Sequence, residues 1–343
     1  MPAVGIDISD YSIKFMCMRA HAHEITLDAY GKFDIPLGTI ERGEVKDMQT
    51  LSSLLARLHH EHNFTFAHLA LPEEHAYLFE TKLPMTSEQE MTQMIEFNLK
   101  ENVPLGAEEA LFDYSIVHTT GTECVVNVSV YPITYVTSYL DACEAAHLTP
   151  LSIEIEGQAT ARALIPWDSP DTVLIVDIGR TSASLSISCG SIVTFTANLE
   201  VGGDTFTRAM ARALDVSFQE ADKMKRTHGF IDSPESATVY GALRPSIEQF
   251  KETIRHHLMY WQMHASTSEG RQADVSRMVL VGGNANMSGL AEYLEAELDV
   301  PVDVGNVWTN VFNTSNVVPP IHRNESLEYA TATGLALRSL YRS

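Results

Sequence analysis

The sequence predicts an α/β protein of two lobes, and three observations support this prediction. An apolar strand that ends in an aspartate and runs into a turn of small and polar residues occurs twice, at Val4–Lys14 and at Leu174–Ser184. Each copy opens a run of three strand-like segments, and helical segments follow it. Alternating strands and helices are typical of α/β folds. The 343 residues, 45% of them hydrophobic, suffice for two ordinary cores.

The first lobe opens with a predicted meander. Apolar and alternating runs predict strands at 4–8, 13–18, 24–30, 66–71, 76–82, 111–118 and 123–131. Helices are predicted at about 47–61, from Thr86-Ser87 to a point before Pro104, at 133–147 and at 157–165. Ile153 and Ile155 alternate with glutamates and indicate one more strand before the last of these helices.

The second lobe repeats the opening theme. Strands are predicted at 172–178, 183–189, 192–197 and 277–281. Helices are predicted at about 204–214, 217–227, 235–265, 287–297 and 325–341. A meander that begins with an aspartate-bearing turn, once per lobe, is an internal structural repeat. It points to an actin-like, ribonuclease H-like fold, in which two lobes face each other across a nucleotide cleft.

The two turns also indicate a chemistry. A tight turn exposes successive backbone N–H groups that form a concave anion site, and an aspartate can hold a metal ion or its water. One such turn is a weak signal. Two of them, in a chain long enough for two lobes, suggest a bound nucleotide.

Composition excludes some classes of partner. The net charge of −22 argues against direct binding to nucleic acid or to an anionic bilayer, although solubility or a salty cell would also explain it. No apolar run approaches the length of a membrane span, and no signal peptide opens the sequence. The four cysteines are scattered, which favours free thiols in a reducing cytoplasm over disulfides or a zinc site.

Four stretches of the chain form one set of motifs. The first contains Gly5, Asp7, Ser12 and Lys14. The other three stretches are Lys82–Thr86 with Glu96–Leu99 and Val103–Leu105, Gly202–Thr207 with Ala221–Lys225, and Gly282–Ala285. Together they resemble the PilM family of type IV pilus assembly proteins, relatives of the cell-division protein FtsA, and the first stretch matches that family's Gly-x-Asp-x-Gly-Ser-x-x-x-Lys pattern. Each fragment alone is weak, whereas their order and spacing together are specific.

The resemblance implies four subdomains. The first-lobe core would comprise residues 1–35, 151–172 and 325–343, with an extra subdomain of the FtsA and PilM type over 36–150. The second-lobe core would comprise 173–200 and 275–324, and a helical subdomain on the adenosine side would comprise 201–274.

The resemblance also implies ATP and Mg²⁺ as ligands. Asp7 and Asp177 would hold the metal, mostly through its waters, and Glu156 would orient the attacking water, with Gln158 as the alternative. Phosphate would be approached by Ser9, Ser12 and Lys14 from one lobe and by Gly179, Arg180 and Thr181 from the other. The adenosine would be flanked by Gly203, Asp222, Lys225, Gly282, Gly283 and Asn284.

Simpler structural roles compete with these assignments. Asp7 and Asp177 could cap turns, Glu156 could be an ordinary acid in the first turn of a helix, and Lys225 could be a surface lysine in the run 223–226.

The first turn departs from the family pattern. Ser9 stands where the family usually has glycine, and Asp10 places a carboxylate beside the expected triphosphate. We hypothesise that Asp10 and Arg180 form a bridge that ATP has to break. The alternative is that both side chains point to solvent.

The function implied by the resemblance is a cytoplasmic ATP-binding scaffold, peripheral to the inner membrane, which binds the N-terminal peptide of a PilN-like membrane protein. Leu105–Tyr114 and the strand 66–71 are candidate docking places for that peptide, by strand addition or apolar pockets. The scaffold would be at most a slow ATPase, and it could self-associate. The alternatives are an FtsA-like filament protein, a nucleotide-free GspL-like secretion scaffold and a small-molecule kinase. The chain stops at Tyr341–Ser343 without a basic amphipathic helix, which counts against the filament, and no substrate-site motif supports the kinase.

Overall fold

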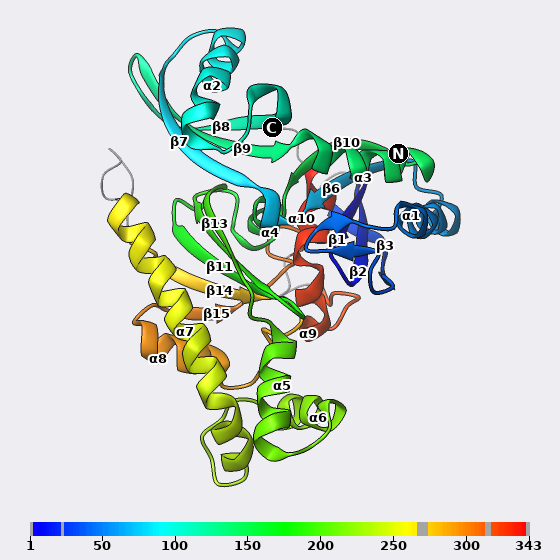
Figure 1. The fold of residues 1–343 in the computed structure, drawn as a ribbon, viewed down its shortest axis with the longest axis vertical. Coiled ribbons are helices and arrows are strands. Elements are labelled where there is room, and N and C mark those ends of the chain that lie inside the picture. The colour runs from blue at the N-terminus through cyan, green and yellow to red at the C-terminus, as the bar shows by residue number, and fades with distance from the viewer. Residues whose placement is uncertain (1–2, 22–23, 266–273, 313–316, 341–343) are drawn as a thin grey trace. The chain divides into compact units, whose positions relative to one another are not determined.

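The computed structural model describes residues 3–21, 24–265, 274–312 and 317–340 (Figure 1). The chain divides into two compact units. Unit 1 comprises residues 1–166, 308–320 and 331–343, and unit 2 comprises 167–307 and 321–330. Unit 2 is thus inserted into the sequence of unit 1. After most of unit 2, the chain returns to unit 1 at residue 308 and again at residue 331.

Unit 1 is built on a five-stranded sheet in the order β10-β6-β1-β2-β3. Its strands are β1 (Val4–Ile8), β2 (Ser12–His21), β3 (Glu24–Asp34), β6 (Phe66–Leu71) and β10 (Thr149–Ile155). β1 runs antiparallel to β2 and parallel to β6, and β6 runs parallel to β10. β1 is buried at every position, as expected for a central strand covered on both faces. The carboxyl ends of three parallel strands therefore meet at one edge of this sheet.

Helices pack tightly on this sheet. They are α1 (Met48–His62), α3 (Ile133–Ala145), α4 (Glu156–Leu164) and α10 (Ala330–Arg338). α10 approaches β1 so closely that a Cβ on Gly5 would lie 2.6 Å from the backbone nitrogen of Ala336. A Cβ on Gly334 would overlap the carbonyl of Ala159 in α4. These two glycines allow α4, α10 and the sheet to share one core.

A smaller layer in unit 1 has three strands in the order β7-β9-β8, covered by one helix. The elements are β7 (Tyr77–Pro84), β8 (Ala110–Thr120), β9 (Glu123–Pro132) and α2 (Glu88–Asn102). Met91, Ile95 and Leu99 of α2 are buried against the sheet. The short elements of unit 1 are β4 (Ile40–Glu41), β5 (Glu44–Val45), η1 (Glu73–His75) and η2 (Ala107–Glu109).

Unit 2 repeats the sheet of unit 1, in the order β13-β12-β11-β14-β15. Its strands are β11 (Thr172–Ile178), β12 (Ala183–Cys189), β13 (Ile192–Leu199), β14 (Arg277–Val281) and β15 (Val302–Val304). Its helical elements are α5 (Gly203–Leu214), α6 (Phe218–His228), α7 (Ala237–Ala265), α8 (Leu290–Leu298), α9 (Arg323–Ser326) and η3 (Leu327–Tyr329). One face of α7 is apolar and buried, from Ile247 to Trp261.

The predicted α/β class and internal repeat are confirmed, since both five-stranded sheets have the same order and directions. The predicted closing helix, 325–341, is instead α9, η3 and α10, and residue 341 lies outside the described residues. β4, β5 and β15 were not predicted. Residues 36–150, expected as one subdomain, include β6, which pairs with β1 and β10 in the main sheet.

The cysteines and the helices bear on two further expectations. Cys17, Cys124 and Cys143 are buried free thiols, and Cys189 is a half-buried one. Within the described residues, no helix combines the length and the apolar character that crossing a membrane requires.

Candidate functional site

The two aspartate-bearing turns occupy equivalent places in their sheets. Asp7 lies opposite Lys14 of β2 and Ala70 of β6, and Asp177 lies opposite Ser184 of β12 and Val281 of β14. In both sheets a turn of four residues follows, 9–12 in unit 1 and 179–182 in unit 2. The predicted repeat therefore extends to the register of individual residues.

The unit 1 turn is closed by its serines. The Ser9 N–H and hydroxyl donate to the carbonyl of Ser12 at 3.0 and 3.2 Å, and the Ser12 N–H donates to Ser9 Oγ at 3.3 Å. Ser9, which replaces the family's glycine, thus supplies a side chain that holds the turn together. Asp10 accepts the N–H groups of Arg42 and Gly43, at 2.8 and 2.9 Å. Its carboxylate fastens the turn to the short β4–β5 hairpin.

Asp7 is paired with a cation. The Lys14 ammonium lies 3.0 Å from Asp7 Oδ2, and the two side chains are 17% and 6% exposed. The predicted metal ligand of β1 and the predicted phosphate-binding lysine of β2 therefore lie together. A buried carboxylate needs such a partner, because burying an unpaired charge is costly.

A carboxylate lies at the carboxyl end of each of the three parallel strands of unit 1. Asp7 is the last residue but one of β1, Glu73 follows β6 after Pro72, and Glu156 is the first residue of α4 after β10. Glu73 is buried, and its Oε1 accepts the Gly157 N–H at 2.6 Å, so it caps α4 next to Glu156. Burial, followed by the charges of Glu73 and Glu156, raises the pKa of Tyr131 well above its ordinary value.

Sequence reasoning missed Glu73. The available signal was its place two residues after the end of a buried strand, since ligands of open α/β sheets bind at the carboxyl ends of parallel strands.

Backbone N–H groups of α5 and the Asn284 side chain close the unit 2 turn, and Gly202 allows close packing against it. The Gly203 N–H and the Asn284 side-chain amide donate to the Gly179 carbonyl at 3.0 and 2.8 Å, and the Asp204 N–H donates to the Arg180 carbonyl at 2.8 Å. A Cβ on Gly202 would lie 2.6 Å from the carbonyl carbon of Thr181. The start of α5 is thus packed directly on the turn.

A buried lysine organises this side of unit 2. Lys225 is 5% exposed, and its ammonium donates to the Gly203 carbonyl at 3.1 Å, to Thr207 Oγ1 at 2.7 Å and to Asn284 Oδ1 at 3.3 Å. Burial lowers the pKa of Lys225, and the nearby Asp222 opposes this shift. The expectation of a surface lysine is wrong, because α5, α6 and the turn after β14 converge on its side chain.

Lys225 links Asp222 to the 282–284 turn, because its ammonium contacts both Asp222 and Asn284. Asp222 contacts the ammonium of Lys225 at 3.3 Å and the guanidinium of Arg226 at 2.8 Å. Burial would raise the pKa of Asp222, but the Arg226 hydrogen bond and the charges of Lys225 and Arg226 together lower it. Gly282 has φ +89°, and a Cβ there would overlap Asp177 Oδ1. Beside Gly283 a Cβ would meet open space.

Asp10 and Arg180, for which we hypothesised a bridge, each have other partners within their own unit. Both carboxylate oxygens of Asp10 accept backbone N–H groups, and Arg180, 61% exposed, lies 3.3 Å from Asp204 Oδ2. The alternative, in which both side chains point to solvent, is wrong for Asp10, whereas the Arg180 side chain is largely exposed. The position of Asp10 follows from the β4–β5 hairpin, which the sequence analysis did not predict.

The comparisons with known proteins agree with this fold. The sequence matches the family described as "Type IV pilus assembly protein PilM" over residues 5–340. The chain belongs to the PilM family.

Among solved structures, the "PilM-PilN type IV pilus biogenesis complex" matches with TM-score 0.82 and 23% identity, over 100% of this chain and 99% of that chain. The ethanolamine utilization protein EutJ from Carboxydothermus hydrogenoformans matches with TM-score 0.56 and 15% identity, over 98% and 89% of the two chains. MreB5 of Spiroplasma citri bound to ADP matches with TM-score 0.56 and 11% identity, over 97% and 94%. The predicted actin-like fold with its PilM-type architecture is confirmed.

The residues present fit a magnesium nucleotide by their chemistry. Each five-stranded sheet ends a central strand in an aspartate, and carboxylates suit Mg²⁺. Unit 1 adds the ammonium of Lys14, and unit 2 has open space beside Gly283. Among the described residues, no three histidine, cysteine, aspartate or glutamate side chains are arranged to hold a metal by themselves.

Proposed function

We propose that this PilM-family protein is an ATP-binding scaffold of the type IV pilus inner-membrane assembly, and that it binds the N-terminal peptide of a PilN-like membrane protein. The observation that carries the nucleotide part is the pair of register-matched aspartate turns, one per unit. MreB5 of Spiroplasma citri, a protein of similar fold, is bound to ADP. The scaffold would be cytoplasmic and held at the inner membrane by its partner.

Different residues of the chain would bind the metal ion and the phosphates of the nucleotide. Asp7 and Asp177 would hold Mg²⁺, which neutralises phosphate charge when it is bound. Lys14, now paired with Asp7, would turn toward phosphate. The first N–H groups of α5 already donate to the turn carbonyls of Gly179 and Arg180, so phosphate donors would come from the turn residues 179–181.

The adenosine would bind beside Gly283, and the attacking water would be oriented by Glu156. Open space beside Gly283, with Asp222 and Lys225 nearby, would receive the adenosine. Lys225 would act there mainly by fixing Gly203 and Asn284, because its donors are used inside the protein. Glu156, beside the cap that Glu73 provides for α4, would orient water in a slow hydrolysis.

The peptide of the partner would add to the exposed edge of the three-stranded sheet. β8 is an edge strand of that sheet and exposes Leu111, which is 50% accessible. A sheet edge offers unpaired backbone groups to an extended peptide. The other candidate, the strand 66–71, is unsuitable for strand addition, because β6 is paired with β1 on one side and β10 on the other.

The nucleotide part is tested by equilibrium binding of a fluorescent ATP analogue with Mg²⁺. We expect saturable binding that Asp177→Asn or Lys14→Met weakens at least tenfold, since each removes a charge that faces the phosphates or the metal. Asp171→Asn, which lies before β11, is the matched control and should bind as the unaltered protein does. Absence of binding at millimolar analogue would leave a nucleotide-free scaffold.

The partner part is tested with a synthetic peptide that carries the N-terminal residues of the PilN-like protein from the same cell. We expect it to bind, and we expect Leu111→Pro to weaken binding at least tenfold by disturbing the β8 edge. Leu151→Ala, at another exposed leucine, is the control. Equal binding by all three proteins would place the peptide elsewhere.

A further inference from the structure

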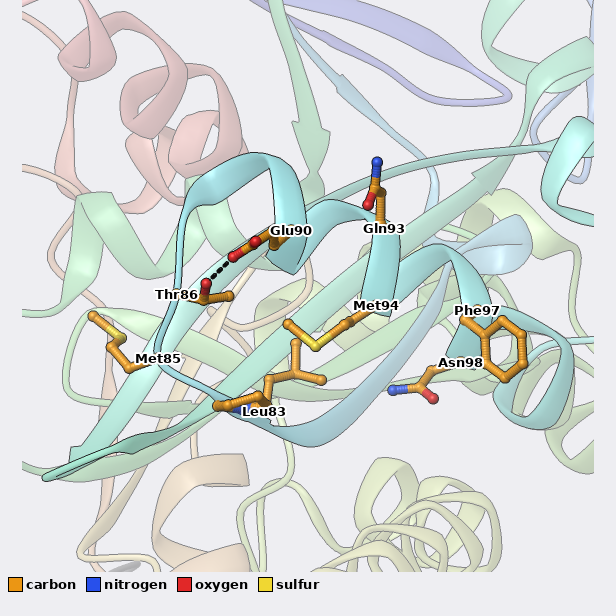
Figure 2. A pocket seen from close by; sticks show the side chains of 9 residues that line it. Leu83, Met85, Thr86, Glu90, Gln93, Met94, Phe97 and Asn98 are labelled. Carbon is orange, nitrogen blue, oxygen red and sulfur yellow. Dashed lines mark hydrogen bonds between the residues drawn. The ribbon is translucent and has the colours of Figure 1, made fainter.

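An open groove lies between α2 and the end of β7, within unit 1 (Figure 2). It has a volume of about 870 Å³ and is lined by side chains from Leu83 to Asn98; we call it the α2 groove. Pockets of 300–1,000 Å³ commonly hold a ligand. None of its lining residues belongs to the two aspartate turns or to the β8 edge. β7 and β8 are opposite edges of their sheet.

The walls of the α2 groove are apolar and exposed. Leu83 is buried at its floor, Met94 is half-buried, and Met85 and Phe97 are 49% and 83% exposed. Exposed apolar side chains that gather in one place are a feature of interaction sites. Methionine adapts its shape to different apolar partners. These walls could therefore pack against the apolar face of a partner segment, and the methionines could adjust to its shape.

The surroundings of the α2 groove are acidic. α2 carries four glutamates, Glu88, Glu90, Glu96 and Glu101, against the single Lys100. The Thr86 hydroxyl donates to Glu90, and this hydrogen bond holds the pKa of Glu90 below its ordinary value. The ammonium of Lys82, at the neighbouring strand, lies 2.8 Å from Glu123. Glu90 lines the groove itself, and α2 as a whole carries more acidic than basic side chains.

We propose that the α2 groove is a docking site for a basic amphipathic segment of another protein. Lysine or arginine on one face of such a segment would meet the glutamates of α2, and its apolar face would cover Met85, Met94 and Phe97. Helix-in-groove recognition uses this combination of apolar anchors with charge complementarity.

Charge complementarity selects this occupant over a second copy of the chain. The protein has 45 acidic against 23 basic residues, so two copies repel each other at a surface that is itself acidic. The inference does not depend on nucleotide binding or on the PilN-like peptide.

The test uses a fluorescein-labelled 18-residue peptide of leucine and lysine, with the leucines three and four apart, and measures its anisotropy with the full chain. We expect saturable binding that weakens as salt increases, because screening reduces the charge attraction. Phe97→Ser should weaken binding at least tenfold. The double change Glu90→Lys with Glu96→Lys should weaken it further and remove most of its salt dependence.

Two matched controls separate the groove from the general charge of the protein. Leu37 has the same exposed fraction as Phe97, 83%, so Leu37→Ser removes a comparably exposed apolar side chain elsewhere. Asp232→Lys with Glu235→Lys, both exposed positions of unit 2, changes the net charge by the same amount as the α2 double variant. Both controls should retain binding within about twofold.

Four outcomes would overturn the proposal. The peptide could fail to bind, it could lose equal affinity in the groove variants and in their controls, or an analogue with glutamate in place of lysine could bind as tightly. Concentration-dependent dimerisation that Phe97→Ser abolishes would identify a second copy as the occupant and would also overturn it. Urea unfolding of each variant checks that the changes at these exposed positions leave the fold intact.

Discussion

The turns after β1 and β11 occupy equivalent positions in two sheets of the same order, yet different groups close them. Ser9 and Asp10 hold the unit 1 turn with their side chains. In unit 2 the equivalent positions are Gly179 and Arg180, and the backbone of α5 together with Asn284 closes the turn. The same strand geometry thus supports two ways of stabilising one turn.

The difference predicts where each turn tolerates substitution. A turn closed by exposed or half-buried side chains loses about one hydrogen bond per substitution, about 1 kcal/mol. A turn packed against glycines and a buried ammonium has no room to adjust, so changes there are more costly. The cation beside the aspartate also differs, because Lys14 faces Asp7 whereas Ser184 faces Asp177.

The largest effect is expected at Lys225. Lys225→Met leaves the Gly203 carbonyl and the side chains of Thr207 and Asn284 without their shared donor. We expect unit 2 to lose about 4 kcal/mol, as when one partner of a buried polar network is removed. Urea unfolding measures the loss, with exposed Lys223→Met as the control within about 0.5 kcal/mol. Equal stability of the two variants would mean that Lys225 does not organise the turn.

Unit 1 should respond to acid through His68. Its ring is buried between Ser152 and Ser339, with both nitrogens 2.7 Å from a serine hydroxyl. Burial, and next the charge of Arg338, lowers the pKa of His68 from 6.5 to about 4. Because the folded pKa is depressed, this contribution to stability is fully present above pH 6.5 and is lost as the pH falls through about 4.

The expected loss is about 3 kcal/mol over that range, at 1.36 kcal/mol for each unit of pKa. Urea unfolding of the protein and of His68→Gln at pH 7, 5.5 and 4.5 measures it. The variant should show the shallower dependence on pH, and parallel curves would contradict the assignment to His68.

Gly203→Ala tests the glycine packing of unit 2. The added Cβ overlaps the Asn284 amide, which both the Gly179 carbonyl and Lys225 hold in place. We expect a loss of about 2 kcal/mol from overpacking. Gly283→Ala, whose Cβ would meet open space, should change the unfolding free energy by less than 0.5 kcal/mol. If both variants unfold alike, close packing does not distinguish the two turns.

The smallest effect is expected at Asp10. Asp10→Ala removes the acceptor of the Arg42 and Gly43 N–H groups, and we expect a loss of about 1 kcal/mol. Amide hydrogen exchange should show faster exchange at residues 42 and 43, while Asp34→Ala leaves these amides unchanged. Unaltered exchange in Asp10→Ala would mean that the hairpin does not depend on this carboxylate.

Much of the fold was predictable from local patterns. Continuous apolar runs predicted β1, β6, β11 and β14 with the bounds the structure has or within one residue of them. β4, β5 and β15 have two or three residues each, too few for periodicity to reveal. The resemblance implied one subdomain over 36–150, and local patterns could not show that β6 pairs with β1 and β10, because neither strand is adjacent to it in sequence.

The candidate site was predictable where one segment forms it. Asp7, Ser12 and Lys14 come from one hairpin, and the structure brings them together. Lys225 was harder to interpret, because it lies in a charged run and its burial depends on Asn284, 59 positions away. Glu73 was missed because its role depends on Gly157, 84 positions away. The physical reason is the same in both cases, since distant segments create the surroundings of a charged group.

The late return of the chain to unit 1 has a consequence for biosynthesis. α10 covers β1 and packs on α4, but a ribosome makes it only after all of unit 2. During translation the sheet of unit 1 lacks α10, so one of its apolar faces is covered only in part, by α4, while unit 2 already has all but a short segment of its chain. Chaperone demand should therefore concentrate on the first-made half, and a stop codon near position 330 should yield an insoluble product despite sparing every strand.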